Sequence, residues 1–224
     1  MAKINSISNA SSQLTVDPGA SGDSFVQFNI NTTGEFRIGV DDTDSDAFVI
    51  AQGSSLGTNN TFRMSALGER TLPLQPGFLA SNSARDTNVT GDGTVYTCEF
   101  DTEVFDIGGD YNNTTDTFTA PVTGIYMFIA IIDTIRAGVS TSCVINIVTT
   151  GQTYSQFSVN PGAIQTGPIA VSLGDMMPYC IVVAQMTATD TAKISIQFSG
   201  TTKTVYIREN SGLNRTMFNG FLVA

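Results

Sequence analysis

Short segments in which apolar and polar residues alternate recur along the whole chain, separated by clusters of Gly, Asn, Asp, Ser and Thr. Alternation with a period of two places successive side chains on opposite faces of a β-strand. We identify no convincing helical period and no internal repeat of solenoid or propeller length. The pattern therefore predicts an all-β protein built from short strands.

The most apolar of these segments ends at Phe128. Tyr126 and Phe128 alternate with Ile125 and Met127, so both faces of this strand carry large apolar groups. A strand that is apolar on both faces lies inside a two-layer structure or against a second chain. Further β-branched runs are bounded by Gly- and Asn-rich turns, a spacing typical of a β-sandwich. These runs are Ser142–Thr149, Tyr179–Ala184 and Lys193–Phe198.

The chain divides into three predicted parts. Residues 1–24 are polar and small and are interpreted as a flexible leader or attachment segment. Residues 25–76 form a β-rich stalk segment, and residues 77–224 form a larger head. The boundary is marked by Pro73 and Pro76, which favour an extended connector. The strands predicted in the stalk segment are 25–30, 35–40, 47–50 and 61–64.

The stalk segment has too few apolar residues for a stable independent monomer, because a small domain buries only a modest part of its surface. Three copies around a shared axis would remove this difficulty, since each chain would then supply one wall of a common core. We therefore expect the stalk segment to be trimeric.

Aromatic and turn residues recur at characteristic distances from the start of this region to its most apolar strand. The positions are Phe100, Asp106, Tyr111, Phe118, Gly124, Tyr126 and Phe128. Their spacing resembles the globular head of complement C1q, a trimeric jelly roll related to the tumour necrosis factor fold. Phe218–Leu222 resembles the closing strand of that family, and Leu173–Asp175 resembles its late Gly-Asp turn. The resemblance implies a homotrimer in which the strand at Phe78–Ala80 pairs with the closing strand. Ala130 departs from the pattern, which places an aromatic there.

The run Arg37–Ile50, followed by Leu56–Asn60, resembles a stalk module of tailed-bacteriophage fibres and related virion proteins, in a match over roughly residues 25–68. That resemblance implies a trimeric shaft placed before a distal head. It also implies that the protein is part of a virion, made in the host cytoplasm without a signal peptide and attached to other virion proteins through its N-terminus. The start of the chain has no apolar signal core.

Composition excludes several function classes. The net charge is −10, which disfavours binding to nucleic acid or to an anionic membrane, and no apolar run is long enough for membrane insertion as a helix. Histidine is absent, which removes Ser-His-Asp and Cys-His nucleophiles and most zinc sites. Cys98, Cys143 and Cys180 are expected to be buried free thiols.

Paired carboxylates remain the one catalytic option. Asp101 and Glu103, with Glu99, are expected to share one face of a strand, and two nearby carboxylates could cleave a glycosidic bond. A solvent-facing strand face explains the same residues, because a half-buried strand needs polar groups on its outer side. The prediction is therefore a protein that is not an enzyme, with no required cofactor.

Calcium is a possible ligand of two acidic segments. Asp42, Asp44 and Asp46 begin like a calcium loop, but Ala47 and Gly53 stand where the turn glycine and the bidentate Glu are needed. A solvated acidic turn is the alternative. A second acidic loop contains Asp106 and Asp110, for which a soluble charged loop is an equal explanation.

Four aromatic residues are expected either in the core of the head or at the seam between its copies. They are Tyr126, Phe128, Phe218 and Phe221.

The predicted function is adhesion by a homotrimeric virion appendage whose head binds a host-surface glycan or protein. Three identical weak sites would supply avidity without a deep pocket. Loops far from the termini are favoured for this contact, with Asn160–Gly162 and Ala188–Asp190 as candidates. A purely structural capsid or tail decoration is the alternative, and a glycan-cleaving fibre tip is a third class.

Overall fold

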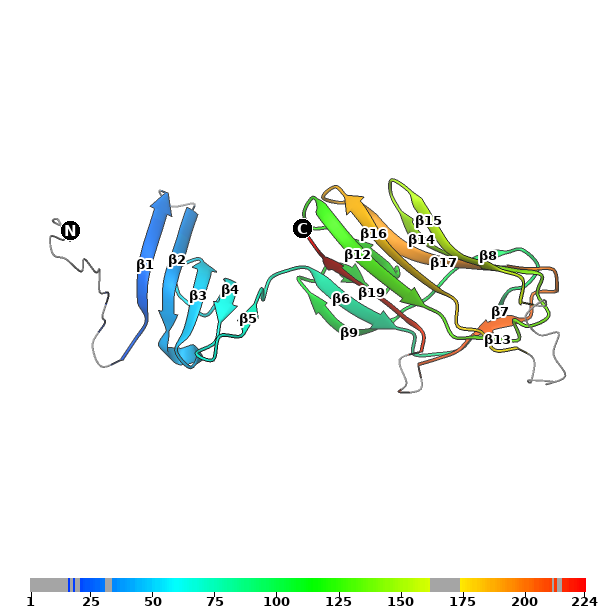
Figure 1. Cartoon of the computed structure of the whole chain (residues 1–224), viewed down its shortest axis with the longest axis horizontal. Coiled ribbons are helices and arrows are strands. Elements are labelled where there is room, and N and C mark those ends of the chain that lie inside the picture. Colours follow the sequence, from blue (N-terminus) through cyan, green and yellow to red (C-terminus); the bar gives the residue numbers. More distant parts are fainter. Residues whose placement is uncertain are drawn as a thin grey trace. The chain divides into compact units, whose positions relative to one another are not determined.

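The computed structural model describes residues 16, 18, 21–30, 34–161, 174–210, 212 and 215–224. Most of the predicted leader, residues 1–24, lies outside these residues, and so does the loop position Gly162. The chain separates into two compact units, residues 1–75 and 76–224, and each is described here by itself. The all-β prediction is confirmed, and the head is a jelly-roll β-sandwich (Figure 1).

The N-terminal unit is one antiparallel sheet whose strands lie in sequence order. All four stalk strands expected from the sequence are present. A single 3-10 turn, η1 (Asp42–Asp44), joins the second and third strands. The strands are β1 (Ser24–Ile30), β2 (Gly34–Asp41), β3 (Ala47–Gln52), β4 (Asn60–Met64) and β5 (Arg70–Thr71).

The head packs two main sheets face to face. The first sheet has the order β16-β12-β19-β6-β9, and the second has the order β10-β11-β17-β14-β15 with β8 beside β17. The first contains β6 (Gly77–Ser81), β9 (Thr102–Ile107), β12 (Gly124–Ile131), β16 (Tyr179–Met186) and β19 (Met217–Leu222). The second contains β8 (Val95–Thr97), β10 (Tyr111–Asn112), β11 (Thr117–Thr119), β14 (Ser142–Thr149), β15 (Thr153–Val159) and β17 (Thr191–Ser199).

A third, short sheet closes one end of the head. It consists of β13 (Thr134–Ile135), β18 (Val205–Ile207) and β7 (Asp86–Thr90). Figure 1 shows β7 and β13 at the end of the head opposite to the C-terminus. We call this end the apex, and we call the end that holds Gly77 and Ala224 the base. The expected pairing of the first and last head strands is confirmed, since Phe78 lies opposite Gly220.

The core of the head lies between its two main sheets and is rich in aromatic rings. Phe78 stacks on Tyr111 at 4.7 Å and meets Phe218 edge-on at 4.9 Å between ring centroids. Gly220 is required beside them, because a Cβ there would lie 2.5 Å from the ring of Phe128. These close contacts fix the two sheets in one register.

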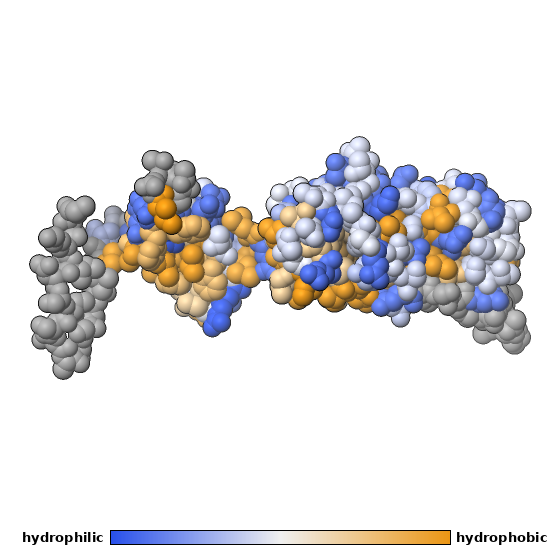
Figure 2. All heavy atoms as spheres, turned by 90° about the horizontal axis from the view of Figure 1, so that it is seen from above, coloured by the Kyte–Doolittle hydropathy of each residue, from blue (hydrophilic) through white to orange (hydrophobic). Residues whose placement is uncertain are grey.

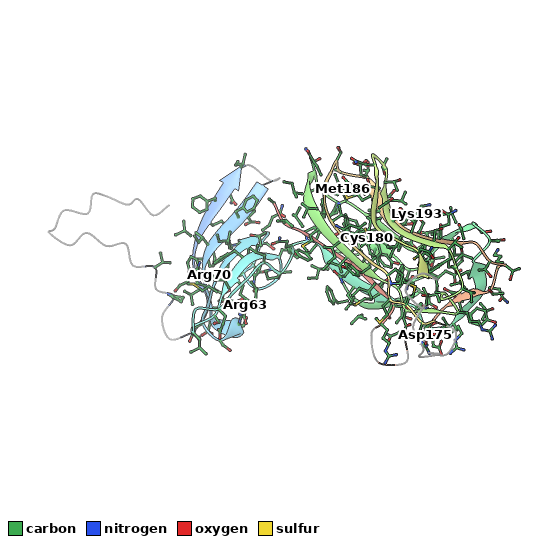
Figure 3. The ribbon with its side chains drawn as sticks, turned by 45° about the vertical axis from the view of Figure 1, so that its right-hand side comes forward. Arg63, Arg70, Asp175, Cys180, Met186 and Lys193 are labelled. Carbon is green, nitrogen blue, oxygen red and sulfur yellow. The ribbon has the colours of Figure 1, made fainter. Side chains whose placement is uncertain are left out.

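All three cysteines are free and fully buried in the head, as the sequence predicted. Burial raises the pKa of the Cys143 thiol to about 12. Cys180 and Met186 on β16 both belong to the buried core (Figure 3). These thiols therefore behave as small apolar side chains.

Candidate functional site

The outward face of the first head sheet is apolar. On β12, Tyr126 and Phe128 point inward and are fully buried, whereas Ile125 and its alternating partners point outward. Ile125 is 41% exposed. The strand is thus apolar on both faces, as the sequence indicated. The outward residues of β12 are Ile125, Met127, Ile129 and Ile131.

The neighbouring strand β16 extends this apolar surface. Tyr179, Ile181 and Val183 are exposed, and they lie opposite Ile131, Ile129 and Met127 respectively. Val183 is 59% exposed, although the residue opposite it on β12, Met127, is also apolar. A contiguous patch of such exposed apolar side chains is unusual for an isolated monomer.

On its other side the surface continues over β19, β6 and β9. Phe221 lies opposite Met127 and is 43% exposed, while Leu79 lies opposite Phe105. A shallow groove of about 340 Å³ opens here between β6, β9 and β19. Figure 2 shows apolar residues gathered along one side of the head.

We call this surface the head apolar face. It comprises the outward residues of β12, β16 and β19, none of which is charged, together with Leu79, Phe105 and Ile107. Its polar members are Gln185 and Asn219. Removing such a face from water is favourable by roughly 25 cal/mol per Å² of apolar area. The face can therefore hold another apolar surface without burying an unpaired charge.

The four aromatics named from the sequence divide between core and surface. Tyr126, Phe128 and Phe218 are fully buried inside a single head, and the Tyr126 hydroxyl donates a hydrogen bond to the Val122 carbonyl at 2.7 Å. Phe221 lies on the head apolar face. Val183 and Ile181 were not predicted as surface residues, although the unbroken apolar run from Tyr179 to Ala184 indicates a strand that is apolar on both faces.

The carboxylates considered for catalysis do not share a strand face, so that prediction is wrong. Glu99 and Asp101 precede β9, which begins at Thr102. Asp101 accepts hydrogen bonds from the amide of Ser83 at 2.7 Å and from its hydroxyl at 2.5 Å. Partial burial alone would raise the pKa of Asp101, but these hydrogen bonds outweigh it and lower the pKa. Asp101 has a structural role in holding the loop.

The acidic segments proposed for calcium are tied into turns of their own. Asp44, the last residue of η1, forms a bidentate ion pair with Arg63, at 2.5 and 2.8 Å, and left-handed Ser45 stands between it and Asp46. Asp106 accepts the amides of Asp110 and Tyr111 at 3.2 and 3.0 Å. Within the described residues, no three acidic or cysteine side chains are grouped to hold a metal ion.

Asp110 has a perturbed environment. Its burial, and next the charge of Asp106, raise the pKa of its carboxyl. It lines an open polar depression of about 610 Å³ at the base of the head, together with Asn113 and Thr189. The depression is wide and open to solvent.

One of the two loops expected to face a partner lies at the wrong end. The amide of Ala188 bonds to Thr123 at 3.0 Å, and Met186 lies opposite Gly124, beside the C-terminus. Ala188–Asp190 is therefore at the base, near the termini. The apex carries other loops instead, including the one that holds Arg136. The Arg136 guanidinium lies over the Tyr206 ring at 4.6 Å and donates to its hydroxyl at 2.9 Å.

An ion cluster centred on buried Asp133 supports these apical loops. Asp133 is almost fully buried and pairs with Arg208 at 3.1 Å, and Arg208 also bonds to Asp175 at 2.6 Å. Arg215 approaches Asp133 at 3.7 Å.

In the described part of the chain, no helix is long and apolar enough to cross a membrane.

The two-sheet sandwich, the short apical sheet and the apolar outward face define a protein of the jelly-roll class. The C1q domain model matches residues 78–223, so the chain belongs to the C1q family. Heads of this class form homotrimers. No curated protein sequence matches the chain.

Solved structures with a similar fold include the globular domain of zebrafish complement 1qA. It is 16% identical and covers 67% of this chain and 98% of its own, with a TM-score of 0.43. Murine APRIL at pH 8.5 is 10% identical and covers 66% of this chain and 99% of its own, with a TM-score of 0.44. These values are too low to support more than the family model already shows.

Proposed function

We propose that the chain is a non-enzymatic, homotrimeric appendage of a virion that adheres to a molecule of the host surface through its head. The observation that carries the trimer is the head apolar face, which a single chain leaves in water. Membership of the C1q family supports the same assembly. The finer parts of the proposal, the virion and the adhesion, rest on the resemblance of the stalk segment to phage fibre modules.

Adhesion follows from the form of such a trimer. Three heads would present three copies of the same apical loops, and three weak contacts held together bind far more tightly than one. The basic side chains near the apex are largely paired with acidic ones, Arg85 with Glu209 and Arg208 with Asp133 and Asp175. The charges of this end therefore largely cancel, and they do not select an anionic ligand.

The attachment side of the proposal concerns the N-terminus. In the phage proteins that residues 37–60 resemble, the stalk module precedes a distal head, so residues 1–24 would join this protein to other virion components. The alternative of a capsid or tail decoration keeps the trimer and removes the host ligand.

The trimer is tested by sedimentation of the full chain and of two matched variants. Val183→Asp places a charge in the head apolar face, whereas Val139→Asp places it on an apical loop at a residue of nearly equal exposure, 59% against 61%. We expect a trimer for the unmodified chain and for Val139→Asp, and monomers for Val183→Asp. A monomeric unmodified chain at micromolar concentration would contradict the proposal.

Adhesion is tested separately with the same proteins on candidate host cells. Saturable binding by the trimer, lost in monomeric Val183→Asp, supports adhesion. A trimer that binds no susceptible host favours the decoration role. The two experiments thus separate the assembly from its use.

A further inference from the structure

The N-terminal sheet has its own exposed apolar face, separate from that of the head. Register places Val26, Ile38, Ile50 and Phe62 side by side in one row across four strands. A second row joins Val40, Phe48 and Met64, and a third contains Phe28 and Phe36. Neighbours in an antiparallel register share a face, so these side chains form one continuous surface.

We call this surface the N-terminal apolar face. None of its members is buried, and its outer residues are strongly exposed, with Phe28 at 58%, Phe36 at 46% and Ile30 at 75%. Figure 2 shows the broad apolar surface of this unit. A soluble monomer rarely leaves so many large apolar groups together in water.

The opposite face of the same sheet is already complete. Ala47, Val49 and Ala51 are fully buried there with Leu56, and these four residues are the unit's own core cluster. Around them Arg37 bonds to Glu35 at 2.7 Å and to Gln27 at 3.1 Å. This face therefore carries the unit's own core cluster and a polar network beside it.

The head decides how many copies of the sheet meet. Five strands about 4.8 Å apart, four of them five to eight residues long, make a face of roughly 400 Å². Two such faces alone bury less than the roughly 1,200 Å² of a specific interface, so the sheet does not choose its partners by itself. The head of the same chain belongs to a family that forms trimers, so three copies of the sheet are already held close together.

We propose that the N-terminal apolar face is a second self-assembly surface, on which the same sheets of two further copies pack to form a three-walled prism. This proposal rests on the proposed homotrimer of the head. The prism buries the three apolar rows at its centre and leaves the Arg37 and Glu35 side outside. The N-terminal sheet is then stable only within the trimer, because its own core cluster is too small to hold it.

Two cysteine variants of the full chain test the prism. Ile50→Cys places a thiol at the centre of the N-terminal apolar face, whereas Gln27→Cys places one on the opposite, exposed face. The native cysteines are fully buried and do not interfere. Mild oxidation or a short bismaleimide should link two chains through Cys at position 50 and not at position 27. A water-soluble maleimide should react about tenfold more slowly at position 50.

A measurement on proteins without new cysteines guards against a variant that folds poorly. Amide hydrogen exchange over β2 and β3 should be at least about tenfold faster in Val183→Asp, in which the heads separate, than in the unmodified chain. Val139→Asp should exchange like the unmodified chain. Equal exchange in all three proteins would overturn the proposal.

The remaining outcomes separate this proposal from that of the head. If the chain sediments as a trimer but Ile50→Cys does not cross-link, the N-terminal sheets do not meet. This outcome overturns the prism and leaves the homotrimer of the head intact. Slow maleimide reaction that becomes fast when residues 1–20 are deleted means that the leader covers the face, which also overturns it. A monomer in sedimentation overturns the proposed homotrimer itself.

Discussion

The two units of this chain bury apolar side chains in different ways. In the head, two sheets pack face to face, so its core of aromatic and branched residues is complete in one copy. The head apolar face lies outside this core. The N-terminal unit is one sheet with a core cluster of four residues, and most of its large apolar side chains lie on the uncovered face. The head should therefore fold alone, whereas the N-terminal unit depends on its copies.

The largest expected effect breaks the head from within. Phe218→Ala removes a fully buried ring that packs against Phe78, Phe100 and Phe128, and we expect it to lower the free energy of unfolding by about 3–5 kcal/mol. All six tyrosines lie in the head, so tyrosine fluorescence in urea at fixed chain concentration follows that unit. The matched control is Phe221→Ala on the outward face of the same strand, which should weaken assembly and leave the isolated head folded.

A second change tests how tightly the two head sheets are packed. Gly220→Ala adds a Cβ 2.5 Å from the ring of Phe128 and 2.9 Å from that of Phe78, so we expect a loss of about 1–3 kcal/mol in the same urea measurement. Gly151→Ala is the control, since nothing lies within 4 Å of its Cβ. Equal stability of the two variants would contradict the tight packing.

The alternation of apolar residues was enough to predict the strands, the sandwich and the burial of Tyr126 and Phe128, because a period of two is set by the backbone itself. It also indicated that β12 carries apolar side chains on both faces. It failed for Glu99 and Asp101, which alternate correctly but precede β9. Apolar and polar residues can alternate in an irregular segment as well as in a strand. Alternation alone therefore does not show at which residue the strand begins.

Other features depend on contacts between distant segments and have no local signal. Ala188–Asp190 lies at the base because β16 runs back along β12, a pairing that no residue of the loop itself encodes. The same holds for Asp44, whose partner Arg63 comes from another strand. The head apolar face was visible only in part, since the exposed and buried apolar residues of β16 look alike in the sequence.

A third prediction uses pH to separate the units. Burial, and next the charge of Glu99, raise the pKa of Asp86 to about 6, and its Oδ2 is buried without a hydrogen-bond partner. A folded pKa above the usual 3.8 means that the head loses stability as pH rises from about 4 to about 6. We expect Asp86→Asn to stabilise the head at pH 7 by about 1 kcal/mol, after allowance for solvent screening at a half-exposed site. The gain should vanish below about pH 4 in urea unfolding followed by tyrosine fluorescence.

The smallest expected effect concerns the N-terminal unit and has the opposite sign. The hydrogen bond from Arg63 lowers the pKa of Asp44 in the folded sheet, against a small opposing effect of burial. A folded pKa below 3.8 means that the pair stabilises the sheet above that pH and that this contribution is lost as pH falls through the folded value. Arg63→Gln should remove this acid sensitivity, whereas Arg70→Gln, which removes an equal charge from β5, should retain it. Hydrogen exchange over β3 and β4 between pH 5 and pH 3 measures the difference, after correction for intrinsic exchange rates. Identical pH profiles for the two variants would mean that acid acts on the assembled sheet through some other group.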